Sequence, residues 1–466
     1  MEMLRKLIII CVITVLVILL VYPLFAYNYL QTNEAGQPIR WDNSKSIQYY
    51  LDPEPLVGYT LEQTHMMLQE AMKLWEDVAT AKVPRFEFAG YLPEDVNESN
   101  YSNYLDKFYC YTESLEYCDN RAVHEGLRTV IIIDGNHKIL ENYLCLLDPN
   151  CIATAGPVTF EGGILDPDIQ YIVQGYAVFG LPSITNGTTS YVSTMTHELG
   201  HLLGLGHVLI NQQLFYAGTG ITEPLLYLPT MLMNPGPGIS AVGASYGTTL
   251  NYDDIVSVSY IYPSDTFNQE TATIMGTVKK SDRSAMPKVN VIVRNVQDPL
   301  CKAYSFMTGR FCTHPGGGMG WVCLEGPDGS YIISGLDPAD YTVEVEEVED
   351  EDMAMAVGLY YDYQLAGDAE FWNEGDQASE DPYAYTVISL AAGETRENVD
   401  IILNRSEVTE GRVKYIPLDV ILANFPLPAT TACTDTTTDY AGLIGVDEGG
   451  DDATATTGGC SLIIKK

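Results

Sequence analysis

Three of the seven histidines in this 466-residue chain lie within eleven residues, in the sequence His-Glu-Leu-Gly-His-Leu-Leu-Gly-Leu-Gly-His that runs from His197 to His207. Residues four apart share one face of a helix, so His197 and His201 can present two imidazoles to a single ion. Gly204 can adopt the positive φ that ends a helix, which lets the chain bring His207 back as a third ligand. Three neutral nitrogens leave one coordination position open, as in catalytic zinc sites.

Glu198 follows the first of these histidines and can polarise a water molecule in the open position. The alternative is an ordinary amphipathic helix with unrelated histidines, but the fixed spacing of these residue types favours a metal site. The sequence therefore predicts one zinc ion, held by His197, His201 and His207. Glu198 is the expected general base of a hydrolytic reaction.

The spacing H-E-x-x-H-x-x-G-x-x-H resembles that of the metzincin clan of zinc endopeptidases, whose second signature is a methionine turn below the metal. Residues 232–235, Leu-Met-Asn-Pro, are similar to the Leu-Met-Tyr-Pro of matrixins, which makes Met233 the expected turn residue. Residues 250–254, Leu-Asn-Tyr-Asp-Asp, resemble the start of the last matrixin helix, where the two aspartates have structural roles. The resemblance covers roughly 41–264 and implies an α+β domain with a twisted mixed sheet and an active-site helix.

By the same resemblance, a protein or peptide substrate binds in extended form along residues 152–156. An extended chain satisfies its backbone groups most easily by adding to a sheet edge. Residues 208–232 are expected to shape the specificity pocket, and their apolar side chains favour an apolar residue just after the scissile bond. These side chains are Leu209, Ile210, Leu214, Leu225, Leu226 and Leu228.

Residues 1–26 are typical of a signal peptide, with Arg5 and Lys6 before an apolar run at 7–21 and the sequence Pro-Leu-Phe-Ala at 23–26. This predicts a secreted or cell-surface protein, and an uncleaved segment that attaches the chain to a membrane is the alternative. The formal net charge of −38 excludes nucleic acid as a natural partner. Much of this charge is local, and we interpret the acidic run 344–352 as a solvated surface segment.

Two features depart from matrixins. Only residues 27–40 separate the signal from the first expected strand, which leaves no room for an inhibitory propeptide. The remaining histidines lack ligand spacing, so no second, structural zinc is expected; they are His65, His124, His137 and His314. Asp166 and Asp168 could bind calcium, with a simple role in a turn as the alternative.

Exported chains keep disulfides, and ten cysteines less Cys11 of the signal leave nine, an odd number. The pairs 110/118 and 145/151 are close enough in sequence to be local disulfides. The connectivity of the others stays open; they are Cys301, Cys312, Cys323, Cys433 and Cys460.

Alternation and apolar runs predict the elements that carry the histidines. Strands are expected at 46–51, 85–91, 128–134, 152–157 and 163–173, a helix at 60–80, and the histidine helix from about Ser190. Together these form the expected protease domain, residues 27–264.

From about 272 the pattern changes to short alternating strands, which predicts an all-β sandwich at 272–404. Residues 328–343 resemble a stretch of carboxypeptidase-regulatory-like, transthyretin-like domains, which implies no catalytic residues there. Residues 263–271 read as a linker and 405–466 as a flexible acidic tail. We therefore expect residues 27–264 to cleave short peptides alone.

Two classes of function remain at this point. The first is an exported zinc-dependent endopeptidase in which Glu198 activates a water molecule for peptide-bond hydrolysis. The second is a non-catalytic surface or adhesion protein that uses the same fold and the β-sandwich for binding. Glu198, which such a protein could lose, is present, and this favours the enzyme.

Overall fold

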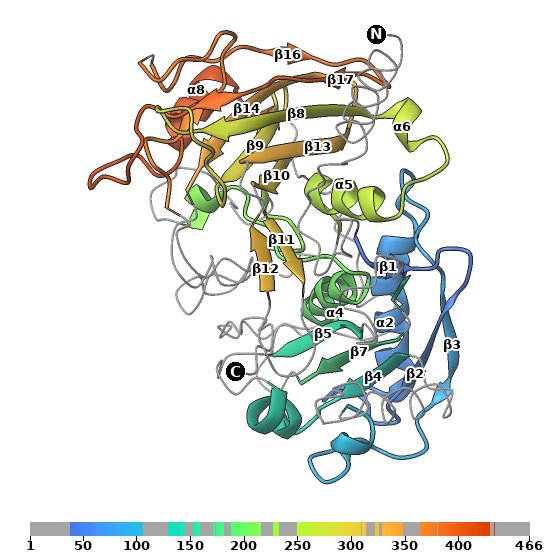
Figure 1. Cartoon of the computed structure of the whole chain (residues 1–466). Coiled ribbons are helices and arrows are strands. Elements are labelled where there is room, and N and C mark those ends of the chain that lie inside the picture. Colours follow the sequence, from blue (N-terminus) through green and yellow to red (C-terminus); the bar gives the residue numbers. More distant parts are fainter. Residues whose placement is uncertain are drawn as a thin grey trace, which may run out of the picture.

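The computed structural model combines several β-sheets with few helices, in an α+β arrangement (Figure 1). It describes residues 38–105, 129–144, 152–158, 171–172, 174–180, 188–215, 227–232, 249–308, 310–313, 322–325, 329–347, 364–379, 381–428 and 433. The expected signal peptide, 1–26, lies outside these ranges. No helix within them is both long and apolar enough to cross a membrane.

The N-terminal half contains a five-stranded sheet in the order β3-β2-β4-β7-β5. Strands β2, β3, β4 and β7 run parallel, whereas β5 is antiparallel to β7 and forms one edge. The strand bounds are β2 Ile47–Leu51, β3 Phe86–Tyr91, β4 Thr129–Ile133, β5 Ala153–Val158 and β7 Gln174–Phe179. The two-residue strands β1 Arg40–Trp41 and β6 Tyr171–Ile172 pair separately.

The strands predicted at 46–51, 85–91, 128–134 and 152–157 are confirmed as β2, β3, β4 and β5. Of the strand predicted at 163–173, residues 171–172 form β6, and the rest of that range lies outside the described residues. The strand β7 at 174–179, which pairs with β4 in the main sheet, was not predicted. All six residues of β7 are buried. A strand that is covered on both faces lacks the alternation of apolar and polar residues that marks a strand in a sequence, which accounts for the omission of β7.

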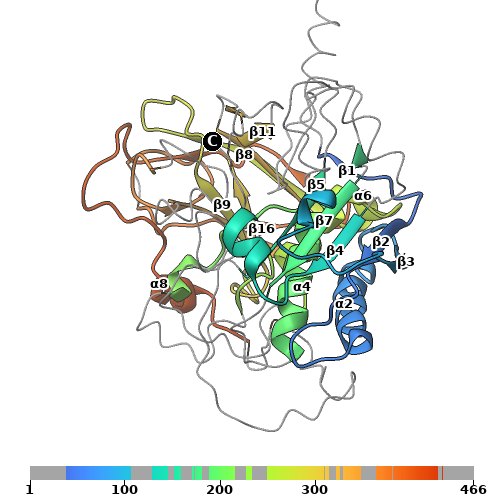
Figure 2. The ribbon, with the colours of Figure 1, turned by 90° about the horizontal axis from the view of Figure 1, so that it is seen from below.

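The central strand β4 is covered on both faces, since every residue of its Thr-Val-Ile-Ile-Ile sequence is buried. Ile131 and Ile133 belong to the main core with helices α2 (Leu61–Glu76) and α4 (Thr188–Leu202). Val130 and Ile132 point into a second core on the opposite face. Figure 2 shows α2 and α4 side by side. Trp75 Nε1 joins them by donating to the Thr196 carbonyl oxygen at 2.9 Å.

The C-terminal half contains two further sheets, which we call the C-terminal sheet pair. One has the order β10-β9-β14-β15 with β16 beside β14, and the other β13-β8-β17 with β18 beside β8. Rings of Phe306 and Tyr331, 6.1 Å apart, bring the two together. The bounds are β8 Ala272–Lys279, β9 Asn290–Asn295, β10 Ala303–Met307, β13 Ser330–Leu336, β14 Asp340–Glu346, β15 Glu370–Phe371, β16 Ile388–Ser389, β17 Thr395–Arg396 and β18 Ile401–Ile402.

The remaining elements are short. A hairpin of β11 (Arg310–Thr313) and β12 (Val322–Glu325) places Cys312 and Cys323 as Cα partners. Single turns of helix are η1 Tyr101–Asn103, η2 Leu140–Leu144 and η4 Gln212–Phe215. The other α-helices of the described residues are α5 Tyr252–Ile261, α6 Phe267–Glu270 and α8 Leu418–Asn424.

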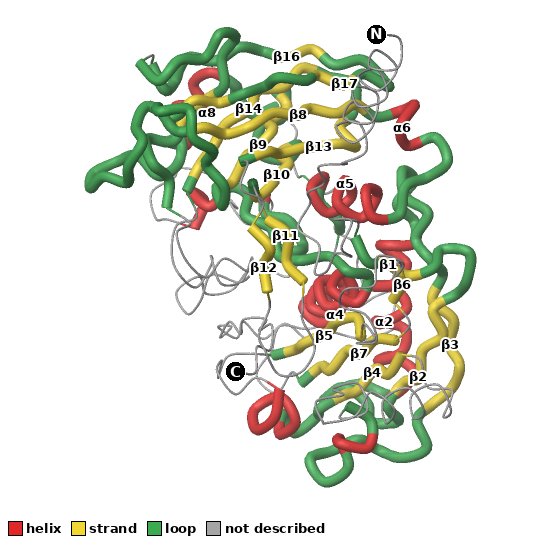
Figure 3. Tube along the Cα trace, in the orientation of Figure 1, coloured by secondary structure: helices red, strands yellow, loops and turns green. Residues whose placement is uncertain are grey.

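The two halves meet across helix α5, which lies between α4 and the C-terminal sheet pair (Figure 3). The predicted linker, 263–271, contains α6, and the ring of Phe267 is buried there. A Cβ added to Gly335 of β13 would lie 3.1 Å from that ring and 3.3 Å from Val256 of α5. The linker residues therefore pack into the interface between the two halves.

Two expectations about polar segments are wrong for the residues that the structure describes; 348–352, 429–432 and 434–466 lie outside them. Within the acidic run, Glu344, Glu346 and Glu347 are buried, at most 2% exposed, because they face basic and amide side chains of the interior. Residues 405–428 of the predicted flexible tail are folded: Ile421 of α8 is fully buried. Cys433 forms a disulfide with Cys301.

Candidate metal centre

Helix α4 carries the first two histidines, and a tight turn returns the third. The helix ends at Leu202, after which Gly204 has a φ of +100°, as predicted for the residue that reverses the chain. The Leu205 amide donates to the Gly200 carbonyl oxygen at 3.0 Å and closes this turn. A Cβ at Gly204 would also lie 3.2 Å from the Ile39 carbonyl oxygen. Both the backbone conformation and the space at this position therefore favour glycine.

The three imidazoles converge on one point. His207 Nε2 lies 3.3 Å from His197 Nε2 and 3.2 Å from His201 Nε2. All three ligand atoms lie within 4.8 Å of one another, so the group can hold a metal ion. Two nitrogens bound tetrahedrally to one zinc at 2.0–2.1 Å would be separated by about 3.3 Å. The two short separations therefore fit a tetrahedral metal ion.

Backbone carbonyls fix which ring nitrogens carry a proton. His197 Nδ1 lies 2.6 Å from the Thr230 carbonyl oxygen, and His201 Nδ1 lies 2.8 Å from that of Leu205. A carbonyl oxygen only accepts, so each Nδ1 must donate and each Nε2 keeps its lone pair. Both lone pairs then point toward His207 Nε2. A proton on that nitrogen could be shared with only one of the two. A cation satisfies all three nitrogens.

Burial keeps two of these rings neutral at physiological pH. It lowers the pKa of His197 to about 4, partly opposed by the hydrogen bond to Thr230. Burial, and then the neighbouring His207 and His197, lower the pKa of His201 well below its ordinary value. Neutral imidazole is the form that binds a metal, so the rings need not lose a proton first.

Glu198 lies on α4 directly after the first histidine, and only 1% of its surface is exposed. A buried carboxylate one residue along the helix from a potential metal ligand is what the sequence motif predicts for a proton acceptor. Of the site residues predicted from sequence, the structure thus describes His197, His201, His207 and Glu198, and brings the three histidines together.

The segment beneath the histidines is held by helix α5. Asp254 accepts hydrogen bonds from the backbone amides of Thr230, at 2.8 Å, and Met231, at 3.0 Å. It also accepts from the Asn251 amide at the start of its own helix. Burial raises the pKa of Asp254 to about 6. The structural role expected for this aspartate is therefore visible: it fixes the carbonyl that orients His197.

A buried methionine lies directly below α4. Met231 is 1% exposed, and a Cβ placed on Gly200 would lie 2.3 Å from its Sδ atom. The predicted turn residue, Met233, lies outside the described residues. Met231, which the sequence did not single out, lies against the histidine helix at Gly200. The sequence signal for this close approach was Gly200, which lies on α4 between the two expected ligands and has no side chain.

The strand expected to bind substrate is at the edge of the sheet formed by the described strands. Residues 153–158 form β5, which pairs with β7 as the last strand of the five-stranded sheet and packs beside α4. The apolar residues expected to shape a specificity pocket are part of the protein interior instead. Those described are buried, at most 4% exposed, and pack within the protein; they are Leu209, Ile210, Leu214 and Leu228.

Other predicted positions either stand apart or lie outside the described ranges. His65 bonds to the Tyr49 hydroxyl at 2.7 Å, and His137 Nδ1 to the Gly180 carbonyl oxygen at 2.9 Å. Within the described ranges no other group of three potential metal ligands is found. The positions outside are His124, His314, Asp166, Asp168, Leu225 and Leu226.

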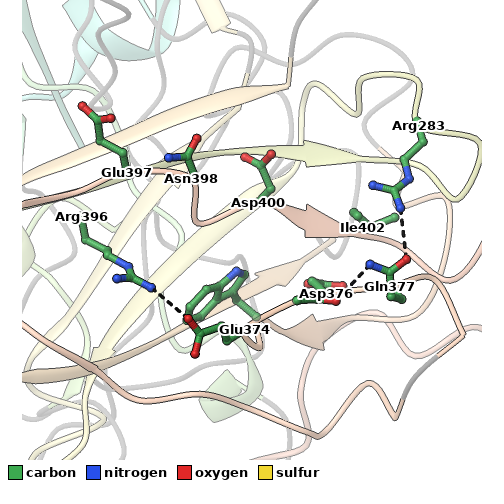
Figure 4. Close-up of a pocket in the computed structure, with 11 residues that line it drawn as sticks. Arg283, Glu374, Asp376, Gln377, Arg396, Glu397, Asn398, Asp400 and Ile402 are labelled. Atoms are coloured by element: carbon green, nitrogen blue, oxygen red, sulfur yellow. Dashed lines mark hydrogen bonds and ion pairs between the residues drawn. The ribbon is translucent and has the colours of Figure 1, made fainter.

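A separate cavity of about 460 Å³ opens on the C-terminal sheet pair (Figure 4). Its wall carries charges of both signs, with Arg396 3.8 Å from Glu374 and Arg283 donating to Gln377 at 3.1 Å. No histidine or cysteine lines it. It is therefore not part of the metal centre.

Comparison with known proteins adds no family. No protein-family model matches this chain, and no curated protein shows significant similarity to it.

Proposed function

We propose that this protein is an exported, zinc-dependent endopeptidase of the metzincin type, closest to matrixins. The observation that carries the proposal is the convergence of His197, His201 and His207 at separations of 3.2 and 3.3 Å, with the buried Glu198 directly after His197 in the sequence. Three histidine nitrogens leave one tetrahedral position open, which distinguishes a catalytic zinc from a closed structural one. The mixed sheet with an antiparallel edge strand beside α4 supports the same fold.

When bound, zinc supplies a Lewis acid that lowers the pKa of a water molecule and polarises the carbonyl of the scissile bond. Glu198 takes the proton from the attacking water and returns it to the leaving amine. The carbonyls of Thr230 and Leu205 hold the rings of His197 and His201 in the orientation that presents Nε2. No nucleophilic side chain is required.

The substrate of this reaction is an extended peptide that adds to the edge of β5 by backbone hydrogen bonds. The antiparallel pairing of β5 with β7 leaves its other edge directed away from the sheet. Export is supported by the Cys301–Cys433 disulfide, which is typical of proteins outside the reducing cytosol.

Metal analysis and a peptide-cleavage assay test the proposal together. The purified protein should contain one zinc per chain, and a chelator should abolish cleavage until zinc is restored. His201→Ala should lose both metal and activity, whereas His65→Ala, a histidine outside the group, should keep both. Bound zinc without cleavage of any peptide in a diverse library would instead favour the non-catalytic binding protein.

A further inference from the structure

We infer that the C-terminal sheet pair positions the third metal ligand, with Arg294 and Asn211 as the positioning residues. The inference rests on the proposed metal site. It adds that the segment directly after His207, residues 208–214, is held in place by side chains from β9 and β14 rather than by the N-terminal half alone.

The segment 208–214 lies between the two halves of the molecule. The Val208 amide donates to the Met231 carbonyl oxygen at 3.0 Å, which ties the segment to the strand-like stretch below α4. Ile210, in contrast, packs with Ile292 of β9 and Ala303 of β10. Val208 is thus fixed by the N-terminal half and Ile210, two residues later, by the C-terminal half.

Asn211 is the point at which four parts of the chain meet. Its backbone has a φ of +57°, in the left-handed region. Its Nδ2 donates to the Tyr227 carbonyl oxygen at 2.8 Å and to that of Leu300 at 3.0 Å. Its Oδ1 accepts from Arg294 Nη1 at 2.6 Å. A hydrogen-bonded asparagine in this conformation fixes the path of the chain only four residues after the ligand.

Arg294 is a buried cation at a position where an apolar residue would be sufficient for packing between the sheets. Its side chain and that of Glu344 are each 1% exposed, with Nε donating to Glu344 Oε1 at 2.7 Å. Nη1 also donates to the Pro299 carbonyl oxygen at 3.0 Å. Apolar residues would fill a strand interior at a lower cost of desolvation, so a buried pair indicates a demand for specific geometry. Here that geometry is the bond to Asn211.

Two further amides extend the same contact. Asn290 Nδ2 of β9 donates to the Leu209 carbonyl oxygen at 2.5 Å and to Glu346 at 3.0 Å. Gln213 Nε2 donates to the Ile416 carbonyl oxygen at 3.1 Å. Residues 209, 211 and 213 are therefore each bonded to the C-terminal half. A simple packing interface would not need a polar contact at every second residue.

The test compares two ion-paired arginines of the C-terminal half in the full-length protein: Arg294, which is buried, and Arg412, which is partly buried. Arg294→Met removes the bond to Asn211. Arg412→Met removes the bidentate pair with Glu347, which is not one of the hydrogen bonds described above for 208–214, and serves as the matched control. The probe is Co²⁺ alone, whose visible absorption reports the coordination of the histidines. Its dissociation constant is measured by competition with a chelator, beside the thermal midpoint.

Arg294→Met should weaken Co²⁺ binding by about 10- to 100-fold, the range for residues that orient metal ligands, and should change the absorption spectrum. Arg412→Met should bind Co²⁺ within about twofold of the wild type even where its thermal midpoint falls. If Arg294→Met does not fold, Asn211→Gly replaces it, since glycine adopts the same φ without the side-chain bonds. Wild-type affinity and spectrum in the folded variant would overturn the inference and leave the proposed function standing. Failure of the wild type to bind Co²⁺ would overturn both.

Discussion

At the scale of single residues, the orientation of the three histidines depends on the hydrogen bonds made by the ring nitrogens that face away from the potential metal position. Thr230 and Leu205 accept from the Nδ1 atoms of His197 and His201, so the tautomer is set before any ion binds. Glu198 makes no ligand bond in the proposed site. Its contribution is therefore separable from metal affinity, which gives a clean experimental distinction.

Glu198→Gln keeps the shape of the side chain and removes its capacity to take a proton. We expect the variant to bind zinc within about threefold of the wild type and to lose about 100- to 10,000-fold in kcat, the range for a positioned acid–base group. Steady-state cleavage of a fluorogenic peptide and zinc titration measure the two effects. Glu407→Gln, an exposed glutamate of the C-terminal half, is the control. Activity near that of the wild type would exclude the proposed role of Glu198.

Asp52 provides a pH dependence of stability. Burial raises its pKa from 3.8 to about 7, although the backbone amides of Glu54 and Val96 donate to it. The folded protein thus holds a proton that the unfolded chain releases near pH 4. The stabilisation is present below pH 4 and is lost as pH rises to about 7.

Relative to Asp52→Asn, the free energy of unfolding of the wild type should therefore decline between pH 4 and pH 7 and then level off. Denaturant unfolding at four pH values measures this. Parallel curves for the two proteins would show that Asp52 ionises normally.

At the scale of elements, α4 and the segment 229–232 fit together through one glycine. An alanine at a helix interior usually stabilises by about 1 kcal/mol relative to glycine. At Gly200 the added methyl group would meet Met231 Sδ at 2.3 Å and Trp75 at 2.9 Å. We expect Gly200→Ala to destabilise the protein by about 1–3 kcal/mol, measured by urea unfolding. Gly156→Ala, whose nearest neighbour is 3.8 Å away, should change stability far less.

The elements and residues that could be predicted from sequence are those whose signal is local. The histidine spacing and the reversal at Gly204 act within eleven residues, and α2 shows its apolar face in its own periodicity. Ile210 shows the limit, because an apolar side chain does not reveal whether it lines a pocket or packs on a distant strand. Arg294 and Asn211 are 83 positions apart, so no local pattern joins them. A charged residue within the buried run Asn-Val-Ile-Val-Arg-Asn was the available signal for a buried partner.

At the scale of the whole molecule, the two halves share one hydrophobic core that includes α5 and strands of the C-terminal sheet pair. Sequence reasoning expected residues 27–264 to be sufficient for peptide cleavage. The contacts in the structure favour the opposite expectation, since a chain ending at 264 would expose Ile210 and Leu214 and remove two of the partners of Asn211, Arg294 and Leu300. Domain independence cannot be read from a change of strand pattern alone.

We therefore expect the shortened chain 27–264 to bind Co²⁺ at least about tenfold more weakly than the full-length protein, and to lose peptide cleavage with it. Chelator competition and the fluorogenic assay measure these effects on the same preparations. A shortened chain that folds, binds Co²⁺ as tightly as the full-length protein and cleaves peptides within a few-fold of its rate would show that the halves work independently.

The contact between Gln213 and Ile416 also sets a sequence of events in time. These residues are 203 positions apart. A chain made from its N-terminus at about 5–20 residues per second completes the histidines about 10–40 seconds before Ile416 is synthesised. During that interval the ligands exist without the strands that hold the third of them. The proposed hydrolytic activity is therefore expected to begin only once the last part of the chain has been made and folded, well after the three histidines have been synthesised.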